Sequence, residues 1–159
     1  MLRVEDGQGL PDANSYVSVL EAEDIAALFG LSWPAGVDID TTLINATDYL
    51  DSKLSPVGCI LDITQSLNFP RKPFYDKQGR LIEDVPDEIK KAVVFLAVQD
   101  SNQSLFEELP GIISQRFGDS SETYSGTFRS SKGGSYVIRR LVALGYGATQ
   151  SGVVTLWRA

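Results

Sequence analysis

The chain has 159 residues, of which 43% are hydrophobic and 22% are charged, so it has the length of one domain and can bury a core of its own. It carries 14 Lys and Arg against 21 Asp and Glu, a formal charge of −7, and contains no histidine, which excludes Ser-His-Asp triads, Cys-His dyads and imidazole metal sites. A single cysteine, Cys59, excludes intrachain disulfides and multi-cysteine zinc sites. Because the start lacks a signal-peptide layout and no membrane-length apolar run occurs, we expect a soluble, acidic, non-secreted domain.

The N-terminal stretch predicts an irregular arm followed by a helix. Residues 4–14 hold two glycines, a proline and three acids, which are turn residues, so residues 1–16 are expected to form an extended arm. The segment Ser18-Val-Leu-Glu21 fits a capping box and predicts a helix over about 18–29, with Gly30 as its end. The apolar face predicted for this helix consists of Leu20, Ala27, Leu28 and Phe29.

Two longer helices are predicted in the middle of the chain. Apolar residues recur at three- and four-residue steps from Asp40, the expected cap, to Leu54, which is the helical period. In this helix Asp48 and Asp51 are expected to face outward. Residues 86–104 begin with a proline and two acids and continue with a broad apolar stripe, which predicts a third helix that is buried on most sides.

The segment between these helices combines basic and aromatic residues. Residues 68–77 (NFPRKPFYDK) contain two prolines and three aromatic residues, so an ordered loop packed by its own rings is predicted. Within it, Arg71, Lys72, Phe74 and Tyr75 offer the mixture that binds single-stranded nucleic acid by stacking and phosphate contact. The favoured interpretation, since this is the only short basic cluster of its kind, is that Phe69 and Phe74 anchor the core while the bases are solvated or contact a neighbouring subunit. Cys59, just before this loop, is interpreted as a small buried side chain.

The C-terminal part of the chain changes in composition. Residues 105–117 allow a short further helix, whereas residues 118–134 are rich in serine and glycine and predict a flexible loop or a small β-hairpin. A terminal helix is predicted over 135–144, with Ser135 as its cap. Beyond a flexible, glycine-containing linker, residues 153–157 form a β-rich tail.

Together these elements predict a mainly α fold. We expect a compact helical bundle with a long loop or small β-hairpin and a β-rich C-terminal tail. In chain order, the expected organisation is an extended N-terminal arm (1–16), a helical body (17–117), a flexible loop or hairpin (118–134), and a terminal helix with a C-terminal docking tail (135–159).

Charge is unevenly distributed along the chain. Residues 1–115 carry 8 basic and 19 acidic side chains, whereas residues 116–159 carry 6 basic and 2 acidic ones. This gradient indicates either a solvated surface with no further role or head-to-side self-association, as rings require. A nucleic-acid footprint is a third interpretation, but a net charge of −7 would steer the chain away from phosphates. The predicted subunit-interface residues are Arg129, Lys132, Arg139 and Arg140.

Signals for catalysis and cofactors are weak. The acid clusters, such as Glu5-Asp6 and Glu83-Asp84, could hold Mg²⁺ or Ca²⁺ through oxygens, but their spacing is not that of an EF-hand, and helix capping and solvation are the favoured explanation. The glycine pairs at Gly133-Gly134 and Gly145-Tyr-Gly147 match no nucleotide-binding signature. We therefore expect no enzymatic activity, no catalytic residue, no metal site and no cofactor.

Four segments resemble a family of tailed-bacteriophage proteins. They are residues 4–23 (VEDGQGLPDANSYVSVLEAE), 46–51 (ATDYLD), 65–72 (QSLNFPRK) and 85–92 (VPDEIKKA). Members are often labelled DnaT-like single-stranded-DNA-binding proteins, are encoded among virion assembly genes, and are similar to head–tail connector (head-completion adaptor) proteins. In the Q-x-L-x-W-P-R motif of the family, Phe69 stands here in place of the usual tryptophan.

The resemblance implies one of two functions. Because the chain is acidic and most of its aromatic residues are predicted to lie in the core, the main expectation is a structural virion protein, a connector subunit in the neck. It would form a homo-oligomeric ring, dodecameric like the portal, beneath the portal protein and against a tail-side neck or stopper protein. Double-stranded DNA would pass through the lumen without specific binding, and no membrane is involved. Its location would be the head–tail interface of the virion, and the host cytoplasm during assembly.

In that interpretation the C-terminal tail docks on the portal protein. The predicted docking residues are Val153, Val154, Thr155, Leu156, Trp157 and Arg158. The alternative is a single-stranded-DNA-binding protein of phage replication or recombination, which would contact DNA through Arg71, Lys72, Phe74 and Tyr75.

Overall fold

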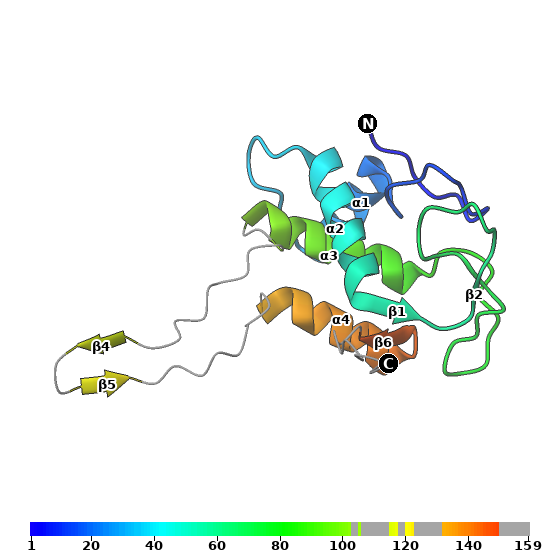
Figure 1. Cartoon of the computed structure of the whole chain (residues 1–159). Helices are drawn as coiled ribbons and strands as arrows, with labels where there is room; N and C mark the ends of the chain where they lie inside the picture. The colour runs from blue at the N-terminus through cyan, green and yellow to red at the C-terminus, as the bar shows by residue number, and fades with distance from the viewer. Residues whose placement is uncertain (103–104, 106–114, 118–119, 123–131, 150–159) are drawn as a thin grey trace.

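Four helices dominate the part of the chain that the structure describes, residues 1–102, 105, 115–117, 120–122 and 132–149. In this computed structural model they are α1 (Val19–Leu28), α2 (Ile39–Lys53), α3 (Asp87–Asn102) and α4 (Lys132–Leu144). Figure 1 shows α3 in the middle, with α1 and α2 on one side of it and α4 on the other. No helix within the described residues is long and apolar enough to span a membrane.

Short antiparallel strand pairs connect the helices. Strand β1 (Leu54–Pro56) pairs with β6 (Gly147–Thr149), β2 (Cys59–Ile60) with β3 (Arg71–Lys72), and β4 (Gln115–Phe117) with β5 (Ser120–Glu122). The expectation of a helical bundle is therefore right only in part, because the described chain is a small mixed α/β fold. The β1–β6 pair closes the end of the fold where α2 and α4 finish (Figure 1).

Helix α3 forms the centre of the core, as its apolar stripe predicts. It begins directly after the buried Pro86 and packs against α1, α2 and α4. Helix α2 contributes Leu43, Ala46 and Leu50, all without exposed surface. The buried residues of α3 are Ile89, Ala92, Val93, Val94, Leu96, Ala97 and Val98.

Helix α1 confirms its predicted cap but not its predicted buried face. The hydroxyl oxygen of Ser18 accepts a hydrogen bond from the backbone N–H of Glu21 at 3.2 Å. The buried residues are Ala22 and Ala26, whereas Leu20 is 76% exposed. The predicted face was wrong because small alanine side chains, rather than leucines, turn towards the other helices and allow close packing.

Several other predictions are corrected by backbone placement. Helix α4 begins at Lys132, so Ser135 lies inside the helix rather than at its cap. Residues 115–117 form strand β4 rather than a helix. Residues 147–149, expected in a flexible linker, pair with β1.

Cys59 is exposed rather than buried, because β2 runs along the surface. Residues 123–131 and 150–159 lie outside the described residues.

Those two undescribed ranges include part of the predicted interface and all of the predicted docking tail. Arg129 lies in the first range, and Val153 to Arg158 lie in the second. The first range also contains most of the predicted loop or hairpin, although residues 115–117 and 120–122 pair as the β4–β5 hairpin.

Candidate nucleic-acid interface

The loop at residues 68–77 buries both of its phenylalanines, which confirms the interpretation that they anchor the core. Phe69 is 1% exposed and Phe74 is 2% exposed, with their ring centroids 5.8 Å apart in an edge-to-face arrangement. Phe74 also stacks on Tyr146, with 5.6 Å between centroids. Phe74 therefore cannot stack on a base, and Tyr75, 55% exposed, is the ring that this loop offers to solvent.

Arg71 is equally committed to contacts within the protein. Its Nε donates to the carbonyl oxygen of Asn68 at 2.6 Å, its Nη2 donates to Asn68 Oδ1 at 3.3 Å, and its Nη1 donates to the carbonyl oxygen of Gly58 at 2.9 Å. A guanidinium with three of its five N–H groups in use has few donors left for a phosphate. Of the four residues predicted for nucleic-acid contact, only Lys72 and Tyr75 remain accessible.

A hydrogen-bonded network anchors this loop to α2 and to the N-terminal arm. The Tyr16 hydroxyl donates to both carboxylate oxygens of Asp51, at 2.8 and 2.9 Å, and the backbone N–H of Asn68 donates to the same carboxylate at 2.9 Å. Asp51, expected to face outward, is largely buried, and burial raises its pKa to about 6 against the opposing effect of these hydrogen bonds. Burial also raises the pKa of Tyr16. The network has a structural role, because its polar groups are satisfied by one another.

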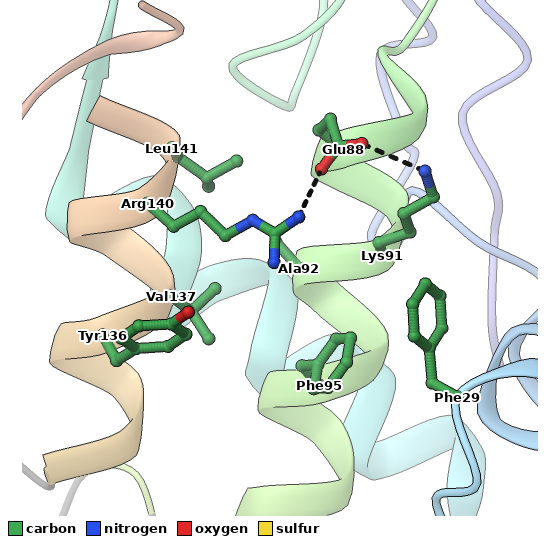
Figure 2. A pocket seen from close by; sticks show the side chains of 9 residues that line it. All are labelled: Phe29, Glu88, Lys91, Ala92, Phe95, Tyr136, Val137, Arg140 and Leu141. Carbon is green, nitrogen blue, oxygen red and sulfur yellow. Dashed lines mark hydrogen bonds and ion pairs between the residues drawn. The ribbon is translucent and has the colours of Figure 1, made fainter. Parts of the chain in front are cut away.

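A second aromatic and basic cluster lies in a groove between α3 and α4, and this groove is the candidate site. Figure 2 shows aromatic rings gathered at one end of the groove and an ionic group at the other. The rings come from the C-cap of α1, from α3 and from α4, which are far apart in sequence. The groove is lined by Phe29, Glu88, Lys91, Ala92, Phe95, Tyr136, Val137, Arg140 and Leu141.

The aromatic end of the groove leaves ring surface open to solvent. Phe29 is 45% exposed and Tyr136 is 65% exposed, and Phe95 lies half-buried between them (Figure 2). The Phe29 and Phe95 rings are 5.3 Å apart between centroids and tilted by 59°. Exposed rings side by side are a platform on which unpaired bases can stack.

The ionic end of the groove is built from one acid and two bases. Glu88 Oε1 accepts a hydrogen bond from Lys91 Nζ at 3.0 Å along α3, and Glu88 Oε2 lies 3.7 Å from Arg140 Nη2 on α4. Arg139 is exposed on the same helix. Arg140, predicted to reach an acid of a neighbouring subunit, thus forms an ion pair with an acid of its own chain.

The groove residues follow the helical period on both helices. Glu88, Lys91 and Phe95 lie on one face of α3 at steps of three and four, and Tyr136 and Arg140 do so on α4. This spacing is visible in the sequence, but the sequence interpretation assigned Phe95 to the core and Phe29 to a buried helix face. It also gave no means of finding that α3 and α4 lie side by side.

Within the described residues, no group of three or more Cys, Asp or Glu side chains is arranged to hold a metal ion. The Glu5 carboxylate, from one predicted acid cluster, is buried and accepts backbone hydrogen bonds from Gly7, Gly9 and Leu10. It therefore organises the N-terminal arm.

The chain matches the model of a known protein family. The family model described as "Putative DnaT-like ssDNA binding protein" matches residues 1–156. Searches of curated proteins and of solved structures gave no match. The matching description names the function that the sequence analysis kept as its alternative.

The match contradicts the predicted connector function. The predictions that depended on it are contradicted as well. They are the ring, the portal and tail-side partners, and double-stranded DNA that passes without specific binding. The error came from weighing the net charge of −7 against DNA binding, although base stacking and phosphate contact depend on the groups within one groove.

Proposed function

Because the chain belongs to the DnaT-like single-stranded-DNA-binding family, whose model matches residues 1–156, we propose that it binds single-stranded DNA in the groove between α3 and α4. The observation that carries the proposal is the row of Phe29, Phe95 and Tyr136 beside the cations Lys91 and Arg140 (Figure 2). The role is binding without catalysis.

The two ends of the groove contact different parts of the strand in this proposal. Bases stack on the aromatic end, with the 65% exposed Tyr136 as the largest open ring face. The backbone phosphates then pass the ionic end, where Lys91 and Arg140 can contact them. Paired bases have no free face to offer, so a duplex would lose the stacking contribution.

The acidic composition is compatible with this assignment. At physiological salt, exposed charges further apart than roughly 8 Å are largely screened, so a bound phosphate responds mainly to the groups in the groove. The net charge of −7 acts on the approach of the DNA instead, by slowing association. We therefore expect moderate affinity and no general attraction to nucleic acid.

The test compares two tyrosines of similar exposure. Fluorescence anisotropy with a labelled single-stranded oligonucleotide is measured for the wild type, Tyr136→Ala and the matched control Tyr75→Ala. Loss of one stacked base costs about 1–3 kcal/mol, roughly a five- to hundredfold weaker affinity, for Tyr136→Ala. Tyr75→Ala should bind as the wild type does, because Tyr75 belongs to the loop at residues 68–77.

Three outcomes would count against the proposal. Equal binding of duplex and single strand, or no binding at all, would contradict the function. Loss of affinity in Tyr75→Ala but not in Tyr136→Ala would move the site from the groove to the loop.

A further inference from the structure

Glu88 has an unusual position for an acid in a groove proposed to bind a polyanion. Its side chain is 29% exposed, and its two oxygens face two cations from different helices, Lys91 on α3 and Arg140 on α4. One carboxylate thus connects the two walls of the groove (Figure 2). In the free protein this carboxylate already offsets one of the two positive charges at this end.

The two contacts of this carboxylate differ in strength. The Lys91 contact, 3.0 Å, is a charge-assisted hydrogen bond. The Arg140 contact, 3.7 Å, is longer than a hydrogen bond, and the Arg140 side chain is 58% exposed. Arg140 is therefore paired with Glu88 by charge and not by a hydrogen bond, and its guanidinium donors can turn to another anion.

We infer that Glu88 occupies the place of a DNA phosphate in the free protein and is displaced when the strand binds. The inference rests on the proposed function of the groove and names what regulates its affinity. A phosphate presents oxygens to the same two cations as the carboxylate does, so DNA binding exchanges one set of ion pairs for another. Glu88 thereby weakens binding and favours strands that also stack on the rings.

This exchange has a signature in the salt dependence of binding. A free cation that neutralises a phosphate of a single strand contributes a slope of about −0.7 to a plot of log K against log salt concentration, because counterions are released. Cations already paired with Glu88 contribute less, since the displaced carboxylate takes up a cation from solution. The wild type should therefore show a shallower slope than its groove cations would give if they were free.

The experiment measures salt-dependent binding of a single-stranded oligonucleotide to Glu88→Gln. We expect binding about three- to tenfold tighter than that of the wild type at low salt, with the slope steeper by about 0.7, because one carboxylate charge has been removed. The matched control is Glu23→Gln, which makes the same change in net charge at an exposed position of α1 outside the groove. Glu23→Gln should change the affinity by less than about twofold and should keep the salt slope of the wild type.

The same substitution in an Arg140→Gln variant tests whether Glu88 acts through Arg140. In Arg140→Gln protein, the additional change Glu88→Gln should give a smaller gain, because Lys91 is then the only one of the two cations left for it to free. Glu88 also lies in the first turn of α3, where an acid stabilises the helix, so thermal melts accompany each variant. If Glu88→Gln does not fold, Glu88→Asp keeps the charge, shortens the reach to Arg140 and should tighten binding in the same direction.

The outcomes separate this inference from the proposed function. If the wild type binds single-stranded DNA and Glu88→Gln behaves like Glu23→Gln, or binds more weakly, the inference is wrong and the function stands. If neither the wild type nor Glu88→Gln binds, both are wrong.

Discussion

Two regions of this molecule combine aromatic rings with positive charge, and they use them in opposite ways. The loop at residues 68–77 concentrates both kinds of residue within ten positions, yet it buries Phe69 and Phe74 and commits Arg71 to backbone carbonyls within the protein. The groove collects its rings from three distant segments and leaves Phe29 and Tyr136 open. Clustering along the sequence is therefore a poor guide to a binding surface, because the fold decides which rings face solvent.

The segments behind the family resemblance divide between these regions. Tyr16, Asp51 and Asn68, from the first three segments, meet in the network that anchors the loop. The fourth segment, residues 85–92, begins α3 and places Glu88 and Lys91 in the groove. Most of what identifies the family thus builds the scaffold, and a smaller part reaches the proposed binding surface.

The largest effect that we expect is on stability, when an aromatic ring of the loop is removed. We expect Phe69→Ala to lower the free energy of unfolding by about 3–5 kcal/mol, because it leaves a cavity next to Tyr16 and Phe74. Chemical denaturation measures the change. Tyr136→Ala, at an exposed ring of the groove, should alter stability by less than about 0.5 kcal/mol. Similar losses in the two variants would contradict the division between scaffold and surface.

A smaller effect is expected from the carboxylate beneath the loop. Burial raises the pKa of Asp51 from 3.8 to about 6 in the folded protein, so the folded state binds the proton more tightly than the unfolded state does. The stability contributed by this proton is fully present below about pH 3.8 and is lost as pH rises through about 6, by an amount of order 3 kcal/mol.

The measurement is the unfolding free energy of wild type and Asp51→Asn between pH 4 and 7. The difference between the two proteins should change over this range, because asparagine carries no titrating proton. Asp48→Asn, at an exposed position of the same helix, should keep the pH dependence of the wild type. A constant difference between wild type and Asp51→Asn would show that Asp51 is not perturbed.

How far the sequence predicted this molecule depends on the range of the interactions involved. The helical period placed α2 and α3, and Ser18 and Gly30 marked the two ends of α1 correctly, because these signals depend on neighbouring residues alone. Two other expected caps were wrong, because Asp40 lies inside α2, whose cap is Asp38, and Ser135 lies inside α4. The outward orientation of Asp51 and the buried face of α1 were wrong, because each depends on what packs against the helix. The groove could not be predicted for the same reason, since it exists only where α4 meets α3.

The smallest expected effect concerns Lys72, the cation of the loop that the fold leaves exposed. If the loop is scaffold, Lys72→Gln should weaken binding of a single-stranded oligonucleotide by less than about twofold, since it removes one screened charge outside the groove. Lys53→Gln makes the same change of charge at an exposed position on α2 and supplies the reference for the general effect of net charge. Equal affinities and equal salt slopes in the two variants would confine the interface to the groove. A loss several-fold greater in Lys72→Gln, with a shallower salt slope than that of Lys53→Gln, would show that the strand continues from the groove onto the loop, and the two regions would then share one binding surface.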